Sequence, residues 1–378
     1  MMDFSTYREQ FPIALDKTFL NHAAISPTPK RVVAALEKLF HEFSHEGLIR
    51  YPRWMERIEE VRRLFASLLG ASPKEVAFVG NTSEGLSLVA SGLDWKQGDG
   101  VMVPVPDFPA NLYPWMNLER LGVNVHFVQR QHGRFDADSL EKALKPGTRL
   151  LSISSVDFAT GFCSDLEAIG QFCRNKGLLF CVDAIQGLGV IPMDVKKWGI
   201  HFLASGGHKW LLSPMGCGGF YVSEEAIDLI HPMRIGWKSV RDPEDFFRIH
   251  FDLMPNALRF EPGTLNVAGI IALGVALEFI LDIGVDQIHR QILSLNDLLI
   301  EGLSHRSLSI ASPLEPGSRS GILSFVPSGD PEALFRFLLE RNVLLSHRGP
   351  MIRLSPHFYN NEADIQAFFR ALDAYESG

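Results

Sequence analysis

The sequence has little cysteine and no excess of positive charge. Four cysteines occur in 378 residues, and none of them forms a CxxC pair. Cysteines this few and this scattered are typical of reduced, mostly buried thiols, so we expect no disulfide framework and a cytoplasmic location. The formal net charge is −8. A nucleic-acid-binding protein would show a basic face, so this class is not expected either.

Long apolar runs are also missing. The longest one, at about 268–277, is followed by Glu278 and Asp282. It is too short to cross a bilayer, so it predicts a buried helix and no membrane partner. The first residues, MMDFSTYR, lack the apolar core of an export signal. Apolar residues make up 46% and charged residues 21% of the chain, which is typical of a globular protein, and 378 residues favour two domains.

Between about residues 74 and 222, short apolar runs alternate with amphipathic stretches. Strands are predicted at 76–78, 101–105, 123–128, 150–154, 178–182, 202–204 and 219–222, and helices at 84–92, 111–121, 138–144 and 165–176. This alternation predicts a three-layer αβα domain with a mostly parallel sheet. Ligands of such sheets bind at the carboxyl ends of the strands.

The C-terminal third has a different pattern. Residues 230–262 are irregular and are followed by predicted helices at 267–283 and 285–303. A βαβ-like tail follows, with strands at 321–325, 343–346 and 351–355 and helices at 331–341 and 362–375. We interpret the chain as a large domain, 19–258, and a smaller C-terminal α/β domain, 259–378, against which residues 1–18 pack.

An acid and a lysine follow two of the predicted strands. Asp183 ends the run FCVD, and Lys209 lies in the glycine-containing segment SGGHKWLL. An amine can form a Schiff base with an aldehyde cofactor while a carboxylate pairs with its ring nitrogen. This is the layout for pyridoxal 5′-phosphate (PLP), which serves as an electron sink. A lone lysine is more often a surface group and a lone aspartate a helix cap, so the other motifs decide.

A third motif, Asn81-Thr82-Ser83, also follows a predicted strand and opens a helix. A helix N-terminus with hydroxyl side chains favours an anion such as phosphate, although an ordinary capped helix has the same pattern.

Together these motifs resemble the class V aminotransferases, fold-type I PLP enzymes that include cysteine desulfurases, kynureninase and isopenicillin-N epimerase-like proteins. The similarity extends from LNHAA at 20–24 to RLSPHFYN at 353–360, and its most specific part is VDAIQ at 182–186 with SGGHKW at 205–210. The resemblance implies a fold-type I enzyme that acts on an amino acid. Transamination is the expected reaction, with epimerisation or a kynureninase-like carbon–carbon lyase as alternatives.

The resemblance also implies individual roles. Lys209 would bind the cofactor and act as the base at the substrate α-carbon, and Asp183 would pair with the pyridine nitrogen. The other implied cofactor contacts are Gln186 at the ring oxygen, Phe108 stacked on the ring, and His208, Thr82 and Ser83 at the phosphate. Many relatives have a serine three residues before the lysine, where this chain has Gly206. A phosphate contact by Ser205 is therefore left open.

Two further matches concern the substrate and a second subunit. Arg353 resembles the arginine that binds the substrate α-carboxylate with its planar fork, and Arg348 is the next candidate. The segment RFEPGT at 259–264 resembles a motif through which a neighbouring subunit reaches the phosphate. The resemblance therefore implies a phosphate contact by Thr264 in a neighbouring subunit and a homodimer with shared active sites. An ordinary Pro-Gly turn would have the same sequence pattern.

Two departures from the family pattern narrow the activity. Desulfurases need a mobile nucleophilic cysteine in the loop before the arginine, and residues 346–352 contain none. We therefore expect no desulfuration. Phe158 stands where many relatives place an asparagine, and Phe108 where desulfurases usually have histidine. A phenylalanine can stack and exclude water but cannot transfer a proton.

An alternative hypothesis comes from His41-Glu42-Phe43-Ser44-His45, which matches the HExxH pattern of zinc hydrolases. Glu59 or Glu60 could supply a third ligand. The surrounding apolar spacing favours an amphipathic helix with histidines facing solvent, so no metal site is expected.

Overall fold

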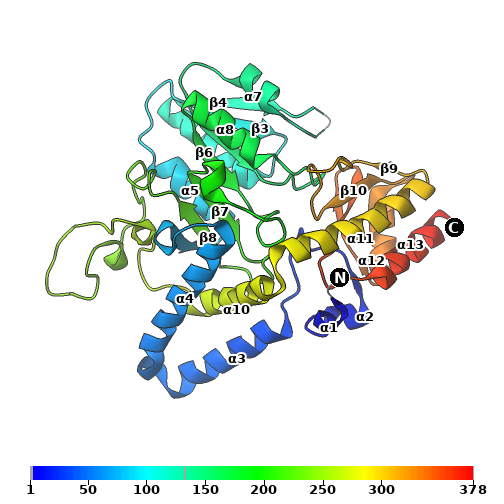
Figure 1. The fold of residues 1–378 in the computed structure, drawn as a ribbon, viewed down its shortest axis with the longest axis horizontal. Coiled ribbons are helices and arrows are strands. Elements are labelled where there is room, and N and C mark those ends of the chain that lie inside the picture. Colours follow the sequence, from blue (N-terminus) through cyan, green and yellow to red (C-terminus); the bar gives the residue numbers. More distant parts are fainter. Residues whose placement is uncertain (1–2, 132, 378) are drawn as a thin grey trace.

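The computed structural model describes residues 3–131 and 133–377. In this part of the chain a seven-stranded sheet lies between two layers of helices, with the strand order β2-β8-β7-β6-β5-β3-β4 (Figure 1). The strands are β2 (Val76–Val79), β3 (Gly100–Val105), β4 (Asn124–Gln129), β5 (Thr148–Ser154), β6 (Leu179–Asp183), β7 (Phe202–Gly206) and β8 (Gly218–Val222). The predicted α/β fold class is confirmed.

One strand departs from the parallel arrangement. β3 to β7 pair in parallel, whereas β8 runs antiparallel to both β7 and β2. Residues 207–217 join β7 to β8, and this connection is too short for a helical crossover, so the chain must return antiparallel. β2 consequently points the same way as β7, and the carboxyl ends of β2, β3, β5, β6 and β7 share one edge.

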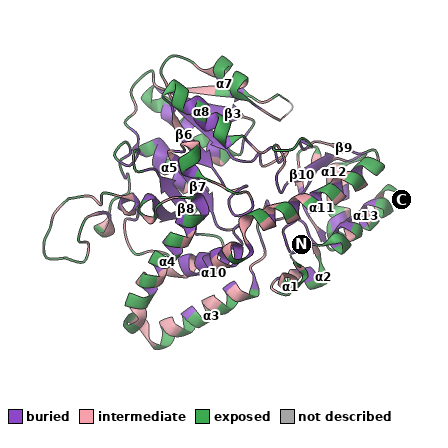
Figure 2. Cartoon of the chain, viewed as in Figure 1, coloured by how far each residue is buried: buried purple, intermediate pink, exposed green. Residues whose placement is uncertain are grey.

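The strands of this sheet other than the edge strand β4 are largely buried beneath the helices on its two faces (Figure 2), and such strands are apolar on both faces. Phe180 and Val182 belong to the core beneath α4 (Tyr51–Leu69), α8 (Leu166–Lys176) and α10 (Val267–Ile283). Cys181, between them in sequence, belongs to the core on the opposite face with α5 (Thr82–Gly92). This alternation follows from the period of two along a strand. The shorter helices are α6 (Tyr113–Met116), α7 (Ala137–Ala143) and α9 (Val195–Trp198).

The C-terminal region forms a second sheet with the order β12-β13-β10-β9. Its elements are β9 (Ser309–Ile310), β10 (Leu323–Val326), α12 (Pro331–Glu340), β12 (Ser346–Arg348), β13 (Met351–Leu354) and α13 (Glu362–Glu376). The βαβ-like prediction was incomplete: β10 and β12 do run the same way, but β13 lies between them and is antiparallel to both. The cause is the two-residue turn after Arg348, where Gly349 has a φ of +57°, because so short a turn returns the chain at once.

The long α11 (Val285–His305) continues from α10 across Gly284 and leads to this second sheet (Figure 1). The apolar residues of α10 nonetheless share the core of the central sheet. Of the N-terminal helices α1 (Ser5–Arg8) and α2 (Ile13–Asp16), α1 contacts the C-terminal segment through Arg8. Arg8 pairs with Asp364 at 2.7 Å, and β1 (Thr18–Phe19) pairs in parallel with β11 (Val343–Leu344). The division at 258/259 stays an interpretation.

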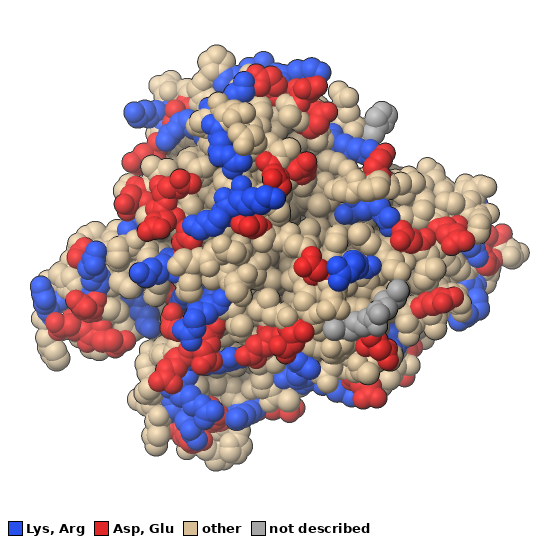
Figure 3. Space-filling view, viewed as in Figure 1, with Lys and Arg blue, Asp and Glu red and all other residues tan. Residues whose placement is uncertain are grey.

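The remaining helix, α3 (Lys30–His45), packs on α10, and the described residues also contain the short 3₁₀ turns Gly47–Arg50, Pro73–Glu75, Pro109–Asn111, Asn117–Leu121, Trp237–Ser239 and Ala257–Phe260. On the face drawn in Figure 3, acidic and basic side chains are interspersed. Within the described ranges, no single helix is long and apolar enough to cross a membrane; α10 and α11 would qualify only together, and they are bent by 78°.

A buried ion pair connects three elements of the large sheet region. The guanidinium of Arg62, on α4, donates to both carboxylate oxygens of Glu261 at 2.6 and 3.0 Å. Glu261 also accepts the backbone N–H of Phe78 on β2 at 2.7 Å. Both charged side chains are at most 4% exposed. The pair therefore fixes the segment that leads to Thr264.

We expect Glu261→Gln to lower the free energy of unfolding by about 1.5–3 kcal/mol, because Arg62 would lose its buried partner and keep only Glu59, which lies at 3.0 Å and is half exposed. Urea denaturation followed by circular dichroism measures the change. Glu60→Gln is the matched control, since Glu60 pairs with Arg57 at 3.0 Å with half of its side chain exposed. It should change stability by less than about 0.5 kcal/mol. Equal effects of the two substitutions would contradict a stabilising role for the buried pair.

Candidate active site

A cavity of about 430 Å³ lies at the carboxyl edge of the central sheet. Its walls come from the segments that follow β2, β3, β5, β6 and β7, from the segment after β1, and from the β12–β13 hairpin. The lining residues are Ala23, Ala24, Ile25, Asn81, Thr82, Ser83, Phe108, Ala110, Phe158, Asp183, Ile185, Gln186, His208, Lys209, Arg348 and Arg353. Eight of the nine predicted site residues therefore meet in one place. Thr264 does not line the cavity and is exposed.

Lys209 follows β7 and projects its amine into this cavity. The Nζ atom lies 5.6 Å from the centroid of the Phe108 ring. Burial lowers the pKa of Lys209 to about 8, nearby Asp183 opposes that shift, and Arg353 and Arg348 add to it. The amine is therefore neutral and nucleophilic closer to neutral pH than an exposed lysine.

Asp183 ends β6, the strand beside β7, and is 2% exposed. Its carboxylate accepts the backbone N–H of Ile185 at 3.0 Å. Burial raises the pKa of Asp183 to about 7, and the nearby Asp107 adds to this shift while Lys209 opposes it. A cationic partner in the cavity would stabilise the ionised form, as a protonated ring nitrogen does.

The side-chain amide of Gln186 has a fixed orientation. The indole Nε1 of Trp210, which can only donate, donates to Gln186 Oε1 at 2.9 Å. Gln186 Nε2 donates to the carbonyl of Ala23 at 3.0 Å. One N–H of this amide group is therefore left to donate to an oxygen atom in the cavity.

The N-terminus of α5 faces the same cavity. Asn81 caps it by accepting the N–H of Glu84 at 2.9 Å, and Thr82 Oγ1 accepts the N–H of Gly206 at 2.9 Å. The hydroxyl hydrogen of Thr82 and the first N–H groups of the helix remain available for an anion.

His208 lies beside this helix end, and burial together with the adjacent Lys209 lowers its pKa. A Cβ atom at Gly206 would lie 3.1 Å from the His208 ring, so glycine leaves room for the imidazole. Ser205 does not line the cavity, and its hydroxyl donates to the carbonyl of Gly206.

The opposite wall contains Arg353 on β13, which is 1% exposed. Its guanidinium donates to the carbonyl of Phe158 and, at 3.3 Å, to Ser346 Oγ. Its Nε–H has no partner among the described residues. Burial, with a further contribution from Arg348, lowers the pKa of Arg353 to about 9, although Asp157 opposes the shift. The Phe158 and Phe108 rings meet edge to face at 5.4 Å, which makes an aromatic corner between Lys209 and Arg353.

The sequence analysis missed Asp107. This buried carboxylate accepts from Ser154 Oγ at 2.8 Å and from Asn111 Nδ2 at 3.0 Å, and it influences Asp183 electrostatically. Asp107 follows β3 as Asp183 follows β6, so the same strand-end rule could have identified it.

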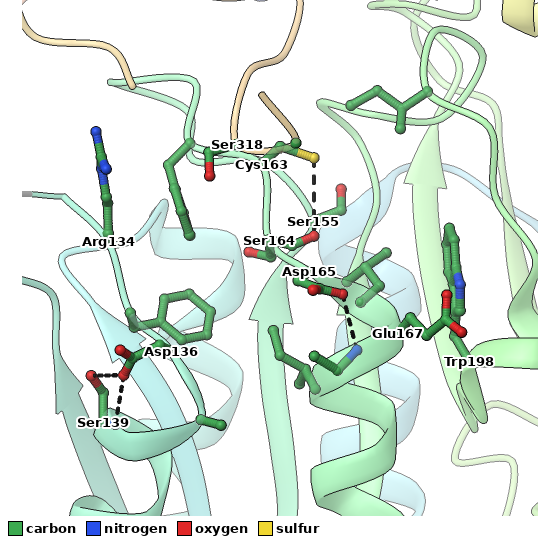
Figure 4. Close-up of a pocket in the computed structure, with 18 of the residues that line it drawn as sticks. Arg134, Asp136, Ser139, Ser155, Cys163, Ser164, Asp165, Glu167, Trp198 and Ser318 are labelled. Atoms are coloured by element: carbon green, nitrogen blue, oxygen red, sulfur yellow. Dashed lines mark hydrogen bonds between the residues drawn. The ribbon is translucent and has the colours of Figure 1, made fainter. Parts of the chain in front are cut away.

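A second, larger cavity of about 860 Å³ lies beside α7 and α8 (Figure 4). Its charged groups have partners: Asp136 caps α7, Asp165 caps α8, and Arg134 pairs with Glu315 at 2.8 Å. Ser155 Oγ has no partner among the described residues. None of the predicted site residues lines it. The residues that line the two cavities therefore favour the smaller one as the candidate active site.

The HExxH motif lies at the end of α3, where the His41 and His45 rings stack with centroids 4.0 Å apart. The Glu42 carboxylate accepts from Trp54 Nε1 at 3.0 Å instead of facing the histidines. Within the described ranges, no three histidine, cysteine or acidic residues are grouped as a metal ion would require. The zinc-hydrolase alternative is thus not supported by this geometry.

Comparisons with known proteins agree with the family resemblance. The family model of Aminotransferase class-V matches residues 18–368. A probable cysteine desulfurase of Methanothermobacter thermautotrophicus is 30% identical, with 97% of this chain and 96% of the relative covered. The uncharacterized aminotransferase YcbU of Bacillus subtilis is 29% identical, with 95% of each covered. The apo cysteine desulfurase of Thermococcus onnurineus NA1 superposes with a TM-score of 0.91 at 29% identity, covering 99% of this chain and 98% of that one.

The charges around Lys209 predict how its reactivity depends on pH. In the cofactor-free protein, labelling of Lys209 by acetic anhydride should have its midpoint near pH 8. Arg353→Met should raise this midpoint because a repelling cation is lost, and Asp183→Asn should lower it because a stabilising anion is lost. Peptide mass spectrometry measures the extent of labelling, with the exposed Lys142 in the same sample as the reagent control. Shifts in the same direction for both variants would contradict the proposed electrostatic environment.

Proposed function

The chain belongs to the class V aminotransferase family, and from this premise we propose that it is a PLP-dependent aminotransferase acting on an amino acid. The observation that carries the proposal is the single cavity in which Lys209 lies between Asp183 and Arg353, with no thiol in its wall among the described residues. The residues fit PLP: an amine with a lowered pKa, a buried carboxylate at a neighbouring strand end, and a helix N-terminus open to an anion.

When bound, PLP supplies an electron sink that stabilises negative charge at the substrate α-carbon. Lys209 would hold its aldehyde group, and Asp183 would keep the ring nitrogen protonated. Thr82, Ser83 and His208 would bind the phosphate. The free N–H of Gln186 would donate to the ring oxygen, and Phe108 would cover the ring and exclude water.

Arg353 would bind the substrate α-carboxylate in a planar, bidentate way, and this contact orients the bonds of the α-carbon. Lys209, whose pKa burial lowers to about 8, would then take the α-proton and return a proton on the same side. One base is enough for the proton shift of a transamination. An epimerisation by two bases needs a second proton acceptor besides Lys209, and the phenylalanines of the pair Phe108–Phe158 cannot accept a proton.

The structure also bears on desulfuration, the activity in the names of several relatives. β12 and β13 are joined by the two-residue turn Gly349-Pro350, so a long mobile loop is absent between these described strands. The four cysteines all lie elsewhere, and burial raises the pKa of each thiol to about 12. A nucleophilic thiolate at the cavity is therefore not available.

We further propose that the active unit is a homodimer. Thr264 is exposed and outside the cavity of its own chain, so a phosphate contact by Thr264 would have to be made in a second copy. The Arg62–Glu261 pair holds the start of this segment in place.

Reduction of the PLP-loaded protein with borohydride should fix the cofactor to the peptide that contains Lys209. Asp183→Asn should still bind cofactor but lose about 3–5 kcal/mol of transition-state stabilisation, the scale of a broken buried charge pair. Absorbance and turnover measurements test both points. A label on another lysine, or near-normal turnover of Asp183→Asn, would remove this assignment.

The exclusion of desulfuration has its own test. A variant with all four cysteines changed to alanine or serine should keep the rate of 2-oxo acid formation within about threefold of wild type, since no thiol takes part. L-cysteine should release no sulfide at catalytic rates from the wild type. Catalytic sulfide release that the cysteine-free variant loses would establish desulfuration and overturn the aminotransferase proposal.

A further inference from the structure

The lining of the cavity contains one cation to which the proposed function assigns no ligand group. In the described part of the chain, its lining contains the cations Lys209, Arg348 and Arg353 and the single carboxylate Asp183. These cations affect one another: Arg348 contributes to the lowered pKa of both Lys209 and Arg353. The proposed function assigns roles to Lys209, Asp183 and Arg353. It assigns no role to Arg348.

Arg348 is half-buried, and its guanidinium has one local contact. Nη1 donates to the carbonyl of the adjacent His347 at 2.8 Å. Within residues 3–131 and 133–377, no carboxylate lies within 4.0 Å of this guanidinium, although most other buried arginines have one. Burial lowers the pKa of Arg348 and has no anion to offset it. An uncompensated charge in a cavity wall is costly, and an anionic ligand would remove that cost.

The β12–β13 register places the two arginines together. Ser346 pairs with Arg353, and Arg348 pairs with Met351. Side chains of directly paired residues lie on the same face of a sheet, as do residues two apart along a strand, so Arg348 and Arg353 share one face as diagonal neighbours. Diagonal neighbours are about 7–8 Å apart at the backbone, a spacing that long side chains bridge easily. Both side chains reach the cavity, so one short molecule can contact both.

The two guanidiniums differ in how firmly they are held. Arg353 is nearly inaccessible and is anchored by the Phe158 carbonyl and Ser346 Oγ. Such a fixed fork suits the α-carboxylate, whose position determines the geometry of the α-carbon. Arg348 lies nearer the turn and is less buried, which suits a group at the end of a side chain.

We propose that Arg353 and Arg348 form a two-cation clamp and that the substrate is an acidic amino acid, with a side-chain carboxylate, of the size of aspartate or glutamate. The inference rests on the proposed function, because it assigns Arg353 to the α-carboxylate and Arg348 to the side chain. Selectivity would come from the unpaired charge that a neutral substrate leaves at Arg348.

The test is a set of absorbance titrations of the PLP-loaded protein, which report amino-acid binding without turnover. L-aspartate and L-glutamate are compared with their neutral isosteres L-asparagine and L-glutamine, and with L-alanine. The wild type should bind each acid about 10- to 100-fold more tightly than its amide, the range for one hydrogen bond between charged groups.

Three variants separate the two arginines. Arg348→Gln should remove the preference for acids and leave the Kd of L-alanine within about threefold of wild type. Arg348→Lys should restore part of the preference, because it keeps the charge but not the fork. Arg353→Gln should weaken all five ligands. The cofactor absorbance and Tm of each variant confirm that the protein is loaded and folded.

Two results would overturn the clamp while leaving the proposed function intact. The first is equal affinity of the wild type for acids and amides. The second is a loss of L-alanine binding in Arg348→Gln as large as the loss of L-aspartate binding, which would assign Arg348 to the α-carboxylate. An absorbance unchanged by every amino acid would instead refute the proposed function, and the clamp with it.

Discussion

The proposed chemistry depends on two opposite charges that are held at the ends of adjacent strands in a poorly solvated cavity. Asp183 ends β6, and Lys209 follows β7. Burial disfavours the charged form of each residue, so the carboxyl pKa rises and the amine pKa falls. Each residue is thus prepared for a different partner: Lys209 for an aldehyde and Asp183 for a ring cation. A parallel sheet produces this arrangement naturally, because the carboxyl ends of neighbouring strands meet at one edge.

The second feature on which the proposed activity depends is the short β12–β13 hairpin. Its two-residue turn leaves no length for a mobile thiol-bearing loop, and its register brings Ser346, Arg348 and Arg353 onto one face. In the proposed function, this short connection argues against desulfuration and supplies the wall that would bind the substrate. The fold is shared with the cysteine desulfurase of Thermococcus onnurineus NA1, which superposes with a TM-score of 0.91 at 29% identity.

Much of the fold was predictable from the sequence. The predicted strands at 76–78, 101–105, 150–154 and 202–204 all lie within or overlap strands of the central sheet, and the fold class and family are confirmed. The direction of β8 and the insertion of β13 between β10 and β12 were not predicted. Both depend on connection length and turn conformation, whereas hydrophobic periodicity records only where strands are.

A site residue was predictable from the sequence where it lies at the end of a predicted strand or shortly after one, as Asp183 and Lys209 do. It was not predictable where the role depends on contacts between distant segments. The amide orientation of Gln186 is fixed by Trp210, which lies 24 residues away in sequence. The influence of Asp107 on Asp183, and the diagonal placement of Arg348 beside Arg353, follow from strand order and register. The assigned roles of these residues stay predictions.

The most direct measurement is the product of a single turnover. The PLP-loaded protein, in excess over L-aspartate or L-glutamate and with no amino acceptor added, should yield one 2-oxo acid per substrate molecule, with the amino group retained on the enzyme. Mass spectrometry of the quenched mixture identifies the product. Racemised amino acid without 2-oxo acid, or a product shortened by carbon–carbon cleavage, would contradict the aminotransferase assignment.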